Sequence, residues 1–258
     1  MCQLLSMNCN TPTDIVFSFT GFSERGGRTD EHKDGWGIAF FEEQGVRHII
    51  DDKPAVESPL AEIVKTQPIK SKNVIAHIRK ATQGEISLQN CHPFIRRAWG
   101  QEWVFAHNGD LKTFAPELHG PYQPVGNTDS ELAFCFLMQS LTEEFGAVAP
   151  SIHQVREFLI RFSAEVAQHG TFNFTLSNGA ALYVHCSTKL HYVERHYPFT
   201  TAALNDENLA VDFSQVTTPQ DRVAVIVTEP LTNNESWVAF APGELKVFVD
   251  GRALAETH

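Results

Sequence analysis

Cys2 is the residue near the start of the chain whose side chain could act as a nucleophile. Removal of the initiator methionine before a small second residue would leave a thiol and a free α-amine on one residue. Because the thiol has an ordinary pKa of about 8.5 and the amine one of about 7.7 to 8.0, the amine can take the thiol proton near neutral pH. Cys2 is therefore a candidate nucleophile with its own base. The alternative is a small apolar residue starting a strand, and Cys2 alone does not decide between them.

Arg79 is the second candidate group, and it follows the apolar run 74–76 in the segment His-Ile-Arg-Lys-Ala-Thr-Gln-Gly at 77–84. A guanidinium at the end of a strand can hold a carboxylate through two parallel hydrogen bonds. The same residue can also be a solvated charge at the edge of a sheet. Arg79 alone does not decide between these two roles, so the other motifs of the chain must be considered with it.

Asn108 and Gly109 follow the strand-like run 103–106. Asn-Gly after a strand is commonly a turn. The pair can also form an oxyanion hole, because the Asn amide and the Gly N–H are two donors that can converge on one developing negative oxygen, with no Cβ to block the approach.

Asp129 lies in Asn-Thr-Asp-Ser at 127–130, a pattern typical of a helix N-cap, although an acid there could also receive a substrate ammonium group. His32, before the turn at 33–35, is expected to be a solvated turn residue, with a polar pocket wall as the alternative. His191 and His196 bracket a strand-like run, but their spacing fits no zinc pattern, so we expect no metal.

The apolar pattern predicts many strands and few helices. Asn178-Gly179 between two strand-like runs is a strong hairpin signal, so we expect mostly antiparallel pairing. Two antiparallel sheets with helices on their outer faces would bury these residues, which places the chain in the α+β class. The expected strands are 36–41, 46–50, 73–79, 102–107, 171–176, 181–186, 190–194, 222–228, 236–240 and 245–249, with main helices at 131–141 and from 150–151 to 170 and shorter ones at 12–19 and 58–66.

The composition excludes several classes of protein. The 258 residues carry 31 acidic and 20 basic side chains, a formal charge of −11, so we expect neither nucleic acid nor an anionic membrane as a partner. The longest apolar run, 132–138, is far too short to span a bilayer. No Lys or Arg precedes Arg25, so a signal peptide is not expected, and the five scattered cysteines indicate reduced thiols in the cytoplasm. We see no linker and expect a single domain over 1–258.

The motifs taken together, in order, resemble the class II glutamine amidotransferases, whose catalytic domains are N-terminal nucleophile hydrolases. They are Cys2, Asp-Gly-Trp-Gly-Ile-Ala at 34–39, His-Ile-Arg-Lys-Ala-Thr at 77–82, His-Asn-Gly-Asp-Leu at 107–111 and Asn-Thr-Asp-Ser-Glu-Leu at 127–132. Val-Thr-Glu-Pro-Leu at 227–231 resembles a later segment, so the likeness covers nearly the whole chain. Within the family, the chain is similar to the stand-alone YafJ-type amidotransferases.

This resemblance implies a four-layer αββα sandwich with two antiparallel sheets and a mature chain that starts at Cys2. It implies that Cys2 is nucleophile and base, and that Asn108 and the Gly109 N–H form the oxyanion hole. It further implies that Arg79 holds the α-carboxylate of glutamine and Asp129 its α-ammonium. No cofactor is implied.

Thr82 is implied as a second substrate contact near Arg79. Four positions depart from the family pattern: many members have an aromatic residue at Lys80 and a histidine at Gln83, and several have Arg-Gly where this chain has 31–32. The differences at Lys80 and Gln83 concern how the loop closes over glutamine. The difference at 31–32 concerns one edge of the substrate site.

The expected activity is hydrolysis of the glutamine γ-amide to glutamate and ammonia. Because a glutaminase uses almost all of the 258 residues, we expect a separate ammonia-accepting synthase as a partner. One alternative is a hydrolase of γ-glutamyl peptides or amides without ammonia transfer. The other is a non-catalytic glutamine-binding module, which would be expected to have lost Cys2, Asn108 or Gly109.

Overall fold

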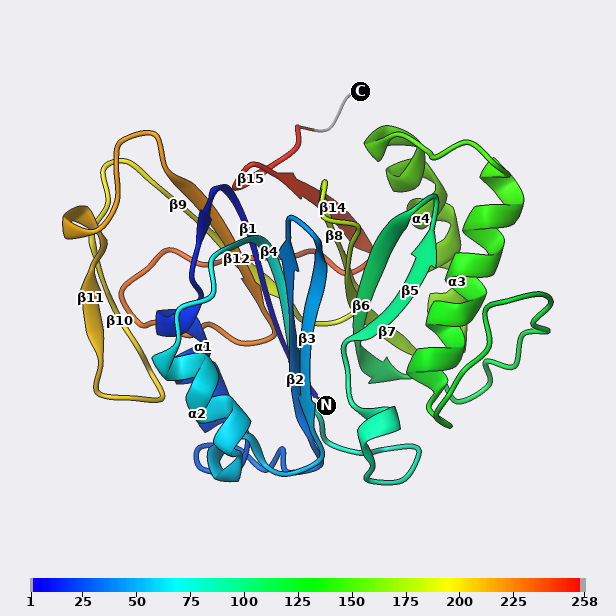
Figure 1. The fold of residues 1–258 in the computed structure, drawn as a ribbon, viewed down its shortest axis with the longest axis horizontal. Coiled ribbons are helices and arrows are strands. Elements are labelled where there is room, and N and C mark those ends of the chain that lie inside the picture. Colours follow the sequence, from blue (N-terminus) through cyan, green and yellow to red (C-terminus); the bar gives the residue numbers. More distant parts are fainter. Residues whose placement is uncertain (1, 256–258) are drawn as a thin grey trace.

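Two β-sheets lie face to face in the computed structural model, which describes residues 2–255 (Figure 1). Helices cover the outer face of each sheet, so the chain forms four layers. The elements are β1 Gln3–Thr13, α1 Val16–Glu24, β2 Trp36–Glu42, β3 Gly45–Asp51, η1 Ala55–Glu57, α2 Pro59–Thr66, β4 Ser71–Ile78, η2 Leu88–Asn90, β5 Phe94–Ala98, β6 Gln101–Asp110, α3 Asp129–Phe145, α4 Ile152–Val166, η3 Ala167–His169, β7 Thr171–Ser177, β8 Leu182–Cys186, β9 His191–His196, β10 Thr201–Ala203, β11 Ala210–Asp212, η4 Phe213–Gln215, β12 Arg222–Val227, β13 Val238–Ala239, β14 Glu244–Val249 and β15 Arg252–Ala253.

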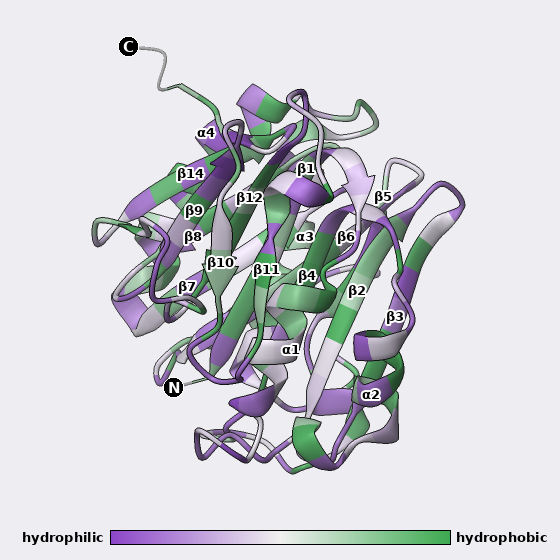
Figure 2. Ribbon diagram, turned by 90° about the vertical axis from the view of Figure 1, so that its left-hand side faces the viewer, coloured by the Kyte–Doolittle hydropathy of each residue, from purple (hydrophilic) through white to green (hydrophobic). Residues whose placement is uncertain are grey.

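The seven-stranded sheet has the order β13-β9-β12-β1-β4-β2-β3, so the first strand of the chain lies at its centre. β1 pairs antiparallel with both neighbours, and Leu5 faces Val227 of β12 on one side and Ala76 of β4 on the other. α1, α2 and the separate β10–β11 pair lie over the outer face of this sheet (Figure 2).

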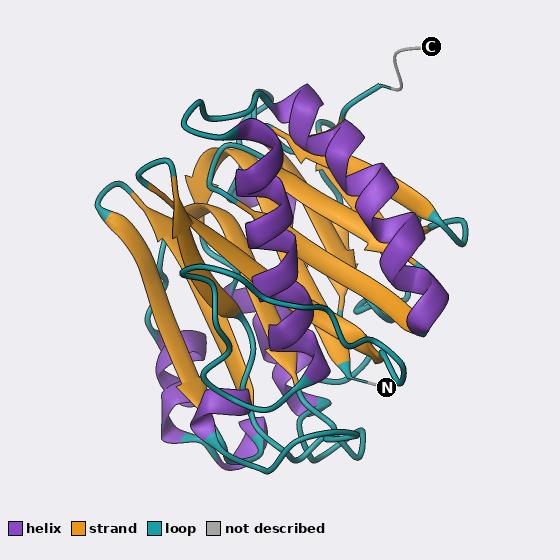
Figure 3. Cartoon of the chain, turned by 90° about the vertical axis from the view of Figure 1, so that its right-hand side faces the viewer, coloured by secondary structure: helices purple, strands orange, loops and turns teal. Residues whose placement is uncertain are grey.

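The six-stranded sheet has the order β15-β14-β8-β7-β6-β5 and is also antiparallel. α3 and α4 cross its outer face (Figure 3). Thr128 caps α3 by accepting a hydrogen bond from the Glu131 N–H, and Ser151 begins α4 with a reciprocal pair of bonds to Gln154. The sequence predicted helices over 131–141 and from 150–151, so both helices are confirmed, and α3 begins at Asp129, before its predicted start.

Successive strand residues point to opposite faces, and here both faces are buried. Leu4 packs between the two sheets, whereas Leu5 packs with α1 and α2 under the outer face. On the other side, Phe105 of β6 stacks on Phe134 of α3 with ring centroids 5.0 Å apart. The apolar interiors therefore hold β1 and β6 in position relative to the helices beside them.

The α+β class with two antiparallel sheets is confirmed, and some elements differ from expectation. The helix expected at 12–19 is wrong in its first part, because β1 continues to Thr13, which pairs with Ser71 beyond a register shift. β1, β5, β10, β11 and β15 were not among the predicted strands. β5 contains Arg96 and Arg97, and its position at the sheet edge allows these charges to leave the apolar layer. In residues 2–255, no helix is both long and apolar enough to cross a membrane.

Replacement of Phe105 by Ala is expected to lower the free energy of unfolding by about 3–5 kcal/mol, because it removes a fully buried ring and leaves a cavity against Phe134. Urea unfolding followed by circular dichroism measures this change. The control is Val148→Ala, since Val148 is 76% exposed and should matter little. Equal effects of the two changes would contradict the packing described for β6 and α3.

Candidate active site

The ends of four strands meet at one end of the sandwich. Cys2 directly precedes β1, and the pairing of Gln3 with Ile78 places the end of β4 beside it. The end of β12 lies on the other side of β1, where the Thr228 N–H bonds to the Leu4 carbonyl. A hydrogen bond from Asn108 to the Thr228 side chain brings the end of β6, from the other sheet, to the same place. Residues far apart in sequence therefore share one site.

The Cys2 thiol is partly buried against the chain that follows Arg79. The Lys80 N–H lies 3.3 Å from the Cys2 Sγ, and the Lys80 carbonyl oxygen is at 3.4 Å. Burial raises the pKa of the Cys2 thiol, while the Lys80 N–H and the positive charge of Arg79 lower it and the negative charge of Asp129 raises it. Both charged side chains therefore lie close enough to act on the thiol.

Arg79 is only 2% exposed, so the interpretation of it as a solvated charge is wrong. Its guanidinium donates to the backbone carbonyls of Gln83 at 2.8 Å, Gly84 at 3.2 Å and Glu85 at 2.9 Å. These bonds fold the loop after β4 around the side chain. Thr82 lies in this loop and is exposed.

The loop is also tied to its surroundings. The Ala81 N–H donates to Asp34 at 2.7 Å, and the Gln83 amide donates to Asp110, at the end of β6, at 2.6 Å. The Lys80 ammonium forms an exposed ion pair with Glu31 at 2.8 Å. The positions at which the sequence departs from the family pattern thus contact other parts of the site's rim.

Asn108 and Gly109 lie within β6 and do not form a turn, so the turn interpretation is wrong. They pair with Asn173 and Phe172 of β7. Asn108 is fully buried, and its Nδ2 donates to the Thr228 Oγ1 at 3.2 Å. Its Oδ1 has no hydrogen-bond partner in the described part of the chain. A Cβ on Gly109 would lie 1.8 Å from the Thr171 carbonyl oxygen, so glycine is required sterically.

Asp129 is the first residue of α3, and it is 9% exposed. Its Oδ2 accepts the Leu111 N–H at 2.7 Å, and its Oδ1 accepts the Ser130 N–H at 2.9 Å. The N-cap is Thr128, so Asp129 is not required for that role. A negative charge in the first turn of a helix is stabilised by the helix dipole, and these bonds fix its direction.

Three buried histidines lie beside the site. His77 and His92 stack with centroids 4.1 Å apart, and His107 contacts the Ser130 hydroxyl at 2.8 Å and the Thr171 carbonyl at 3.0 Å. Burial lowers the pKa of each imidazole, and for His77 and His92 the value falls well below 6.5. These rings are neutral in the folded chain near neutral pH.

The remaining histidines noted from the sequence have ordinary partners. His32 is buried with its Nδ1 3.0 Å from Asp30, so the expectation of a solvated turn residue is wrong. His191 contacts the Thr228 carbonyl, and His196 contacts that of Tyr197. No group of side chains within residues 2–255 has the arrangement of a metal site.

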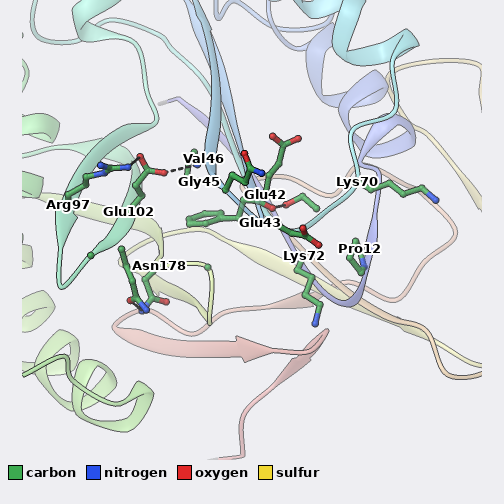
Figure 4. A pocket seen from close by; sticks show the side chains of 16 residues that line it. Pro12, Glu42, Glu43, Gly45, Val46, Lys70, Lys72, Arg97, Glu102 and Asn178 are labelled. Atoms are coloured by element: carbon green, nitrogen blue, oxygen red, sulfur yellow. Dashed lines mark hydrogen bonds and ion pairs between the residues drawn. The ribbon is translucent and has the colours of Figure 1, made fainter.

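A cleft of about 960 Å³ lies at the opposite end of the sandwich. It lies between the β2–β3 and β5–β6 hairpins, where Glu102 bonds to the Val46 N–H and to Arg97 (Figure 4). The residues that line it include none of the candidate catalytic or substrate-binding side chains. The chemistry indicated by the sequence therefore lies at the Cys2 end.

Comparisons with known proteins agree with this geometry. The family model for class II glutamine amidotransferases matches residues 1–258. The chain belongs to this family. A Haemophilus influenzae protein named "Putative glutamine amidotransferase" is 53% identical over 99% of this chain and 87% of its own length, and the Escherichia coli protein "Putative glutamine amidotransferase YafJ" is 47% identical over 98% of this chain and 100% of its own. The expected similarity to YafJ-type proteins is confirmed.

Solved structures support the same assignment. A predicted glutamine amidotransferase from Pseudomonas aeruginosa shares 43% identity with a TM-score of 0.78, over 99% of this chain and 100% of the other. The glutamine phosphoribosylpyrophosphate amidotransferase of Bacillus subtilis superposes with a TM-score of 0.51 over 99% of this chain and 49% of its own, at 15% identity, which supports the fold alone. The arrangement of two antiparallel sheets is therefore one that solved glutamine amidotransferases share.

Thr228 is the residue at this site to which the sequence assigned no role. Its segment, 227–231, was noted only as similar to part of the family, and nothing in a single threonine indicates a contact with Asn108. Thr228 could have been suspected only from its position at the end of a predicted strand, 222–228, which could pair with the N-terminal segment that carries Cys2.

The free energy of unfolding should fall as the pH decreases below about 6.5, because the buried histidines bind protons more weakly in the folded chain than in the unfolded one. Replacement of His92 by Phe keeps a ring beside His77 and removes one such group, so the pH dependence should flatten. Urea unfolding between about pH 5 and pH 7 measures this. The control is the exposed His153→Gln, and identical slopes for both variants would contradict the interpretation.

Proposed function

We propose that this chain hydrolyses the γ-amide of glutamine through a γ-glutamyl thioester on Cys2, and releases glutamate and ammonia for a separate acceptor enzyme. The observation that carries the proposal is the partly buried Cys2 thiol, which lies 3.3 Å from the Lys80 N–H, directly after the buried Arg79, at the end of the sandwich where Asn108 also lies. At the end opposite its γ-amide, glutamine carries a negative α-carboxylate and a positive α-ammonium group. Membership of the amidotransferase family supports the choice of glutamine.

Arg79 and Asp129 would bind the two charged groups of the substrate. Arginine has five N–H groups, and three hydrogen bonds of Arg79 go to loop carbonyls among the described residues, which leaves N–H groups for a carboxylate. Asp129 would accept from the ammonium. Holding both ends of the substrate makes attack by the thiol effectively intramolecular.

The acylation step forms a bond between the Cys2 sulfur and the γ-carbon while the carbonyl electron pair moves onto oxygen. Asn108 Nδ2 and the Gly109 N–H would stabilise this oxyanion more strongly than the neutral carbonyl. Collapse of the adduct breaks the carbon–nitrogen bond and forms the thioester. Ammonia leaves with a proton that came from the thiol.

The α-amine of Cys2 would carry that proton from the thiol to the leaving nitrogen. This role requires removal of Met1, which lies outside the described residues. Water then adds to the thioester, and the sulfur leaves as glutamate is formed. The Lys80 N–H, 3.3 Å from the sulfur, would stabilise the thiolate at both stages.

Protein whose N-terminus is verified as Cys2 by mass spectrometry should form one covalent adduct with a glutamine-mimicking electrophile and convert glutamine to equal amounts of glutamate and ammonia. Cys2→Ala should do neither, and Cys9→Ala, a buried thiol on β1, is the control. A label on any other cysteine would refute the nucleophile assignment. A parallel panel of γ-glutamyl amides identifies the leaving group, and turnover of these amides without turnover of glutamine would replace the proposed substrate.

Replacement of Asp129 by Asn should reduce kcat/KM for glutamine by about tenfold or more, mainly through KM, because one charge-assisted bond contributes roughly 1.5 to 3 kcal/mol. The preference for glutamine over its analogue without the α-amino group should shrink by the same factor. Asp110→Asn, at the end of β6, is the matched control and should leave this preference intact. A full preference in Asp129→Asn would remove Asp129 from the substrate site.

A further inference from the structure

The side chain of Thr228 connects the strand that carries the thiol to the proposed oxyanion hole. Its Oγ1 accepts the Leu4 N–H at 2.9 Å and the Asn108 Nδ2 at 3.2 Å. Thr228 is 4% exposed and Asn108 is fully buried. One hydroxyl group therefore contacts both β1, two residues from Cys2, and β6, at Asn108.

The Thr228 hydroxyl is the hydrogen-bond partner of the Asn108 side-chain amide. The Thr228 Oγ1 accepts two hydrogen bonds, one from the Leu4 N–H and one from the Asn108 Nδ2, so the carboxamide nitrogen is the end that faces the hydroxyl. The Asn108 Oδ1 has no hydrogen-bond partner among residues 2–255, so within this part of the chain the side chain is held by its bond to Thr228. With one Nδ2 hydrogen directed at Thr228, the second remains for the substrate oxygen.

Thr228 is itself held firmly. Its N–H donates to the Leu4 carbonyl at 3.1 Å, and its carbonyl contacts His191 at 3.0 Å. The buried guanidinium of Arg25 donates to the carbonyls of Glu229 and Pro230 at 2.8 and 2.7 Å, which fixes the segment that follows. The hydroxyl therefore has little freedom to turn away from Asn108.

We propose that Thr228 is a positioning residue that acts through Asn108 and keeps the carboxamide nitrogen directed at the developing oxyanion. Without this acceptor, the amide can turn by half a rotation and present its oxygen, which repels a negative charge. The proposal rests on the proposed function, because it concerns the oxyanion of the acylation step. Its effect belongs to the transition state, so kcat should change while substrate binding does not.

Thr228→Val removes the hydroxyl and retains the shape of the side chain. Single-turnover acylation should slow by about tenfold, with KM within about twofold, which is the scale of one lost hydrogen bond. Thr228→Ser, which keeps the hydroxyl, should restore most of the rate. The matched control is Thr232→Val, because Thr232 is equally buried but bonds to Glu235 and Trp237, away from Asn108. Covalent titration of Cys2 normalises each rate to the folded fraction.

The decisive comparison uses the Asn108→Ala background. There, Thr228→Val should have no further effect on acylation, because the amide that it positions is gone. If Thr228→Val does not express as folded protein, Thr228→Ala, which removes the hydroxyl without filling its space, takes its place in the same comparison.

Three results would overturn the inference: equal losses in the Val and Ser variants, the same loss with and without Asn108, or lower thermal stability with unchanged acylation. If Asn108→Ala itself leaves acylation unchanged, the proposed oxyanion hole fails and the inference fails with it. If Asn108→Ala slows acylation and Thr228→Val does not, only the role of Thr228 is refuted.

Discussion

The central position of β1 in its sheet is the constraint on which the rest of the site depends. The strand is hydrogen-bonded along both edges, to β12 and β4, so the residue that precedes it has little freedom. Leu4 and Leu5 point into different apolar layers. A slip of one residue would exchange these faces and move the thiol away from Lys80. Packing of an entire sheet thus determines where Cys2 lies.

The guanidinium of Arg79 is buried and hydrogen-bonded, yet its positive charge can still attract a negatively charged ligand. A buried guanidinium is costly unless its N–H groups are bonded, and the neutral carbonyls at 83–85 supply those bonds. Among residues 2–255 no carboxylate forms an ion pair with Arg79, so none of these residues neutralises its charge. The loop is therefore folded around a cation whose electrostatic partner would be supplied by a ligand.

The departures from the family pattern also acquire a structural meaning. Gln83 bonds to Asp110 at the end of β6, so the loop after β4 is tied to the strand that carries Asn108. Lys80 pairs with Glu31, but this pair is exposed and contributes little to stability. Of these two contacts, the hydrogen bond between Gln83 and Asp110 is the less exposed one.

The sequence by itself determined the α+β class and the family. It also predicted helices behind the cap pattern at 127–130 and from 150–151, and it proposed Cys2, Arg79, Asn108, Gly109 and Asp129 as site residues. These follow from local signals: side-chain caps, period-two apolar runs and short motifs whose order can be read along the chain. Only the tertiary structure decided that Arg79 is buried and bonded to its own loop, that Asn108 lies within a strand, and that Thr228 touches it across 120 residues of sequence. Such contacts arise from the pairing of strands and the packing of two sheets, and no residue's type or local spacing specifies which distant strand end it will meet.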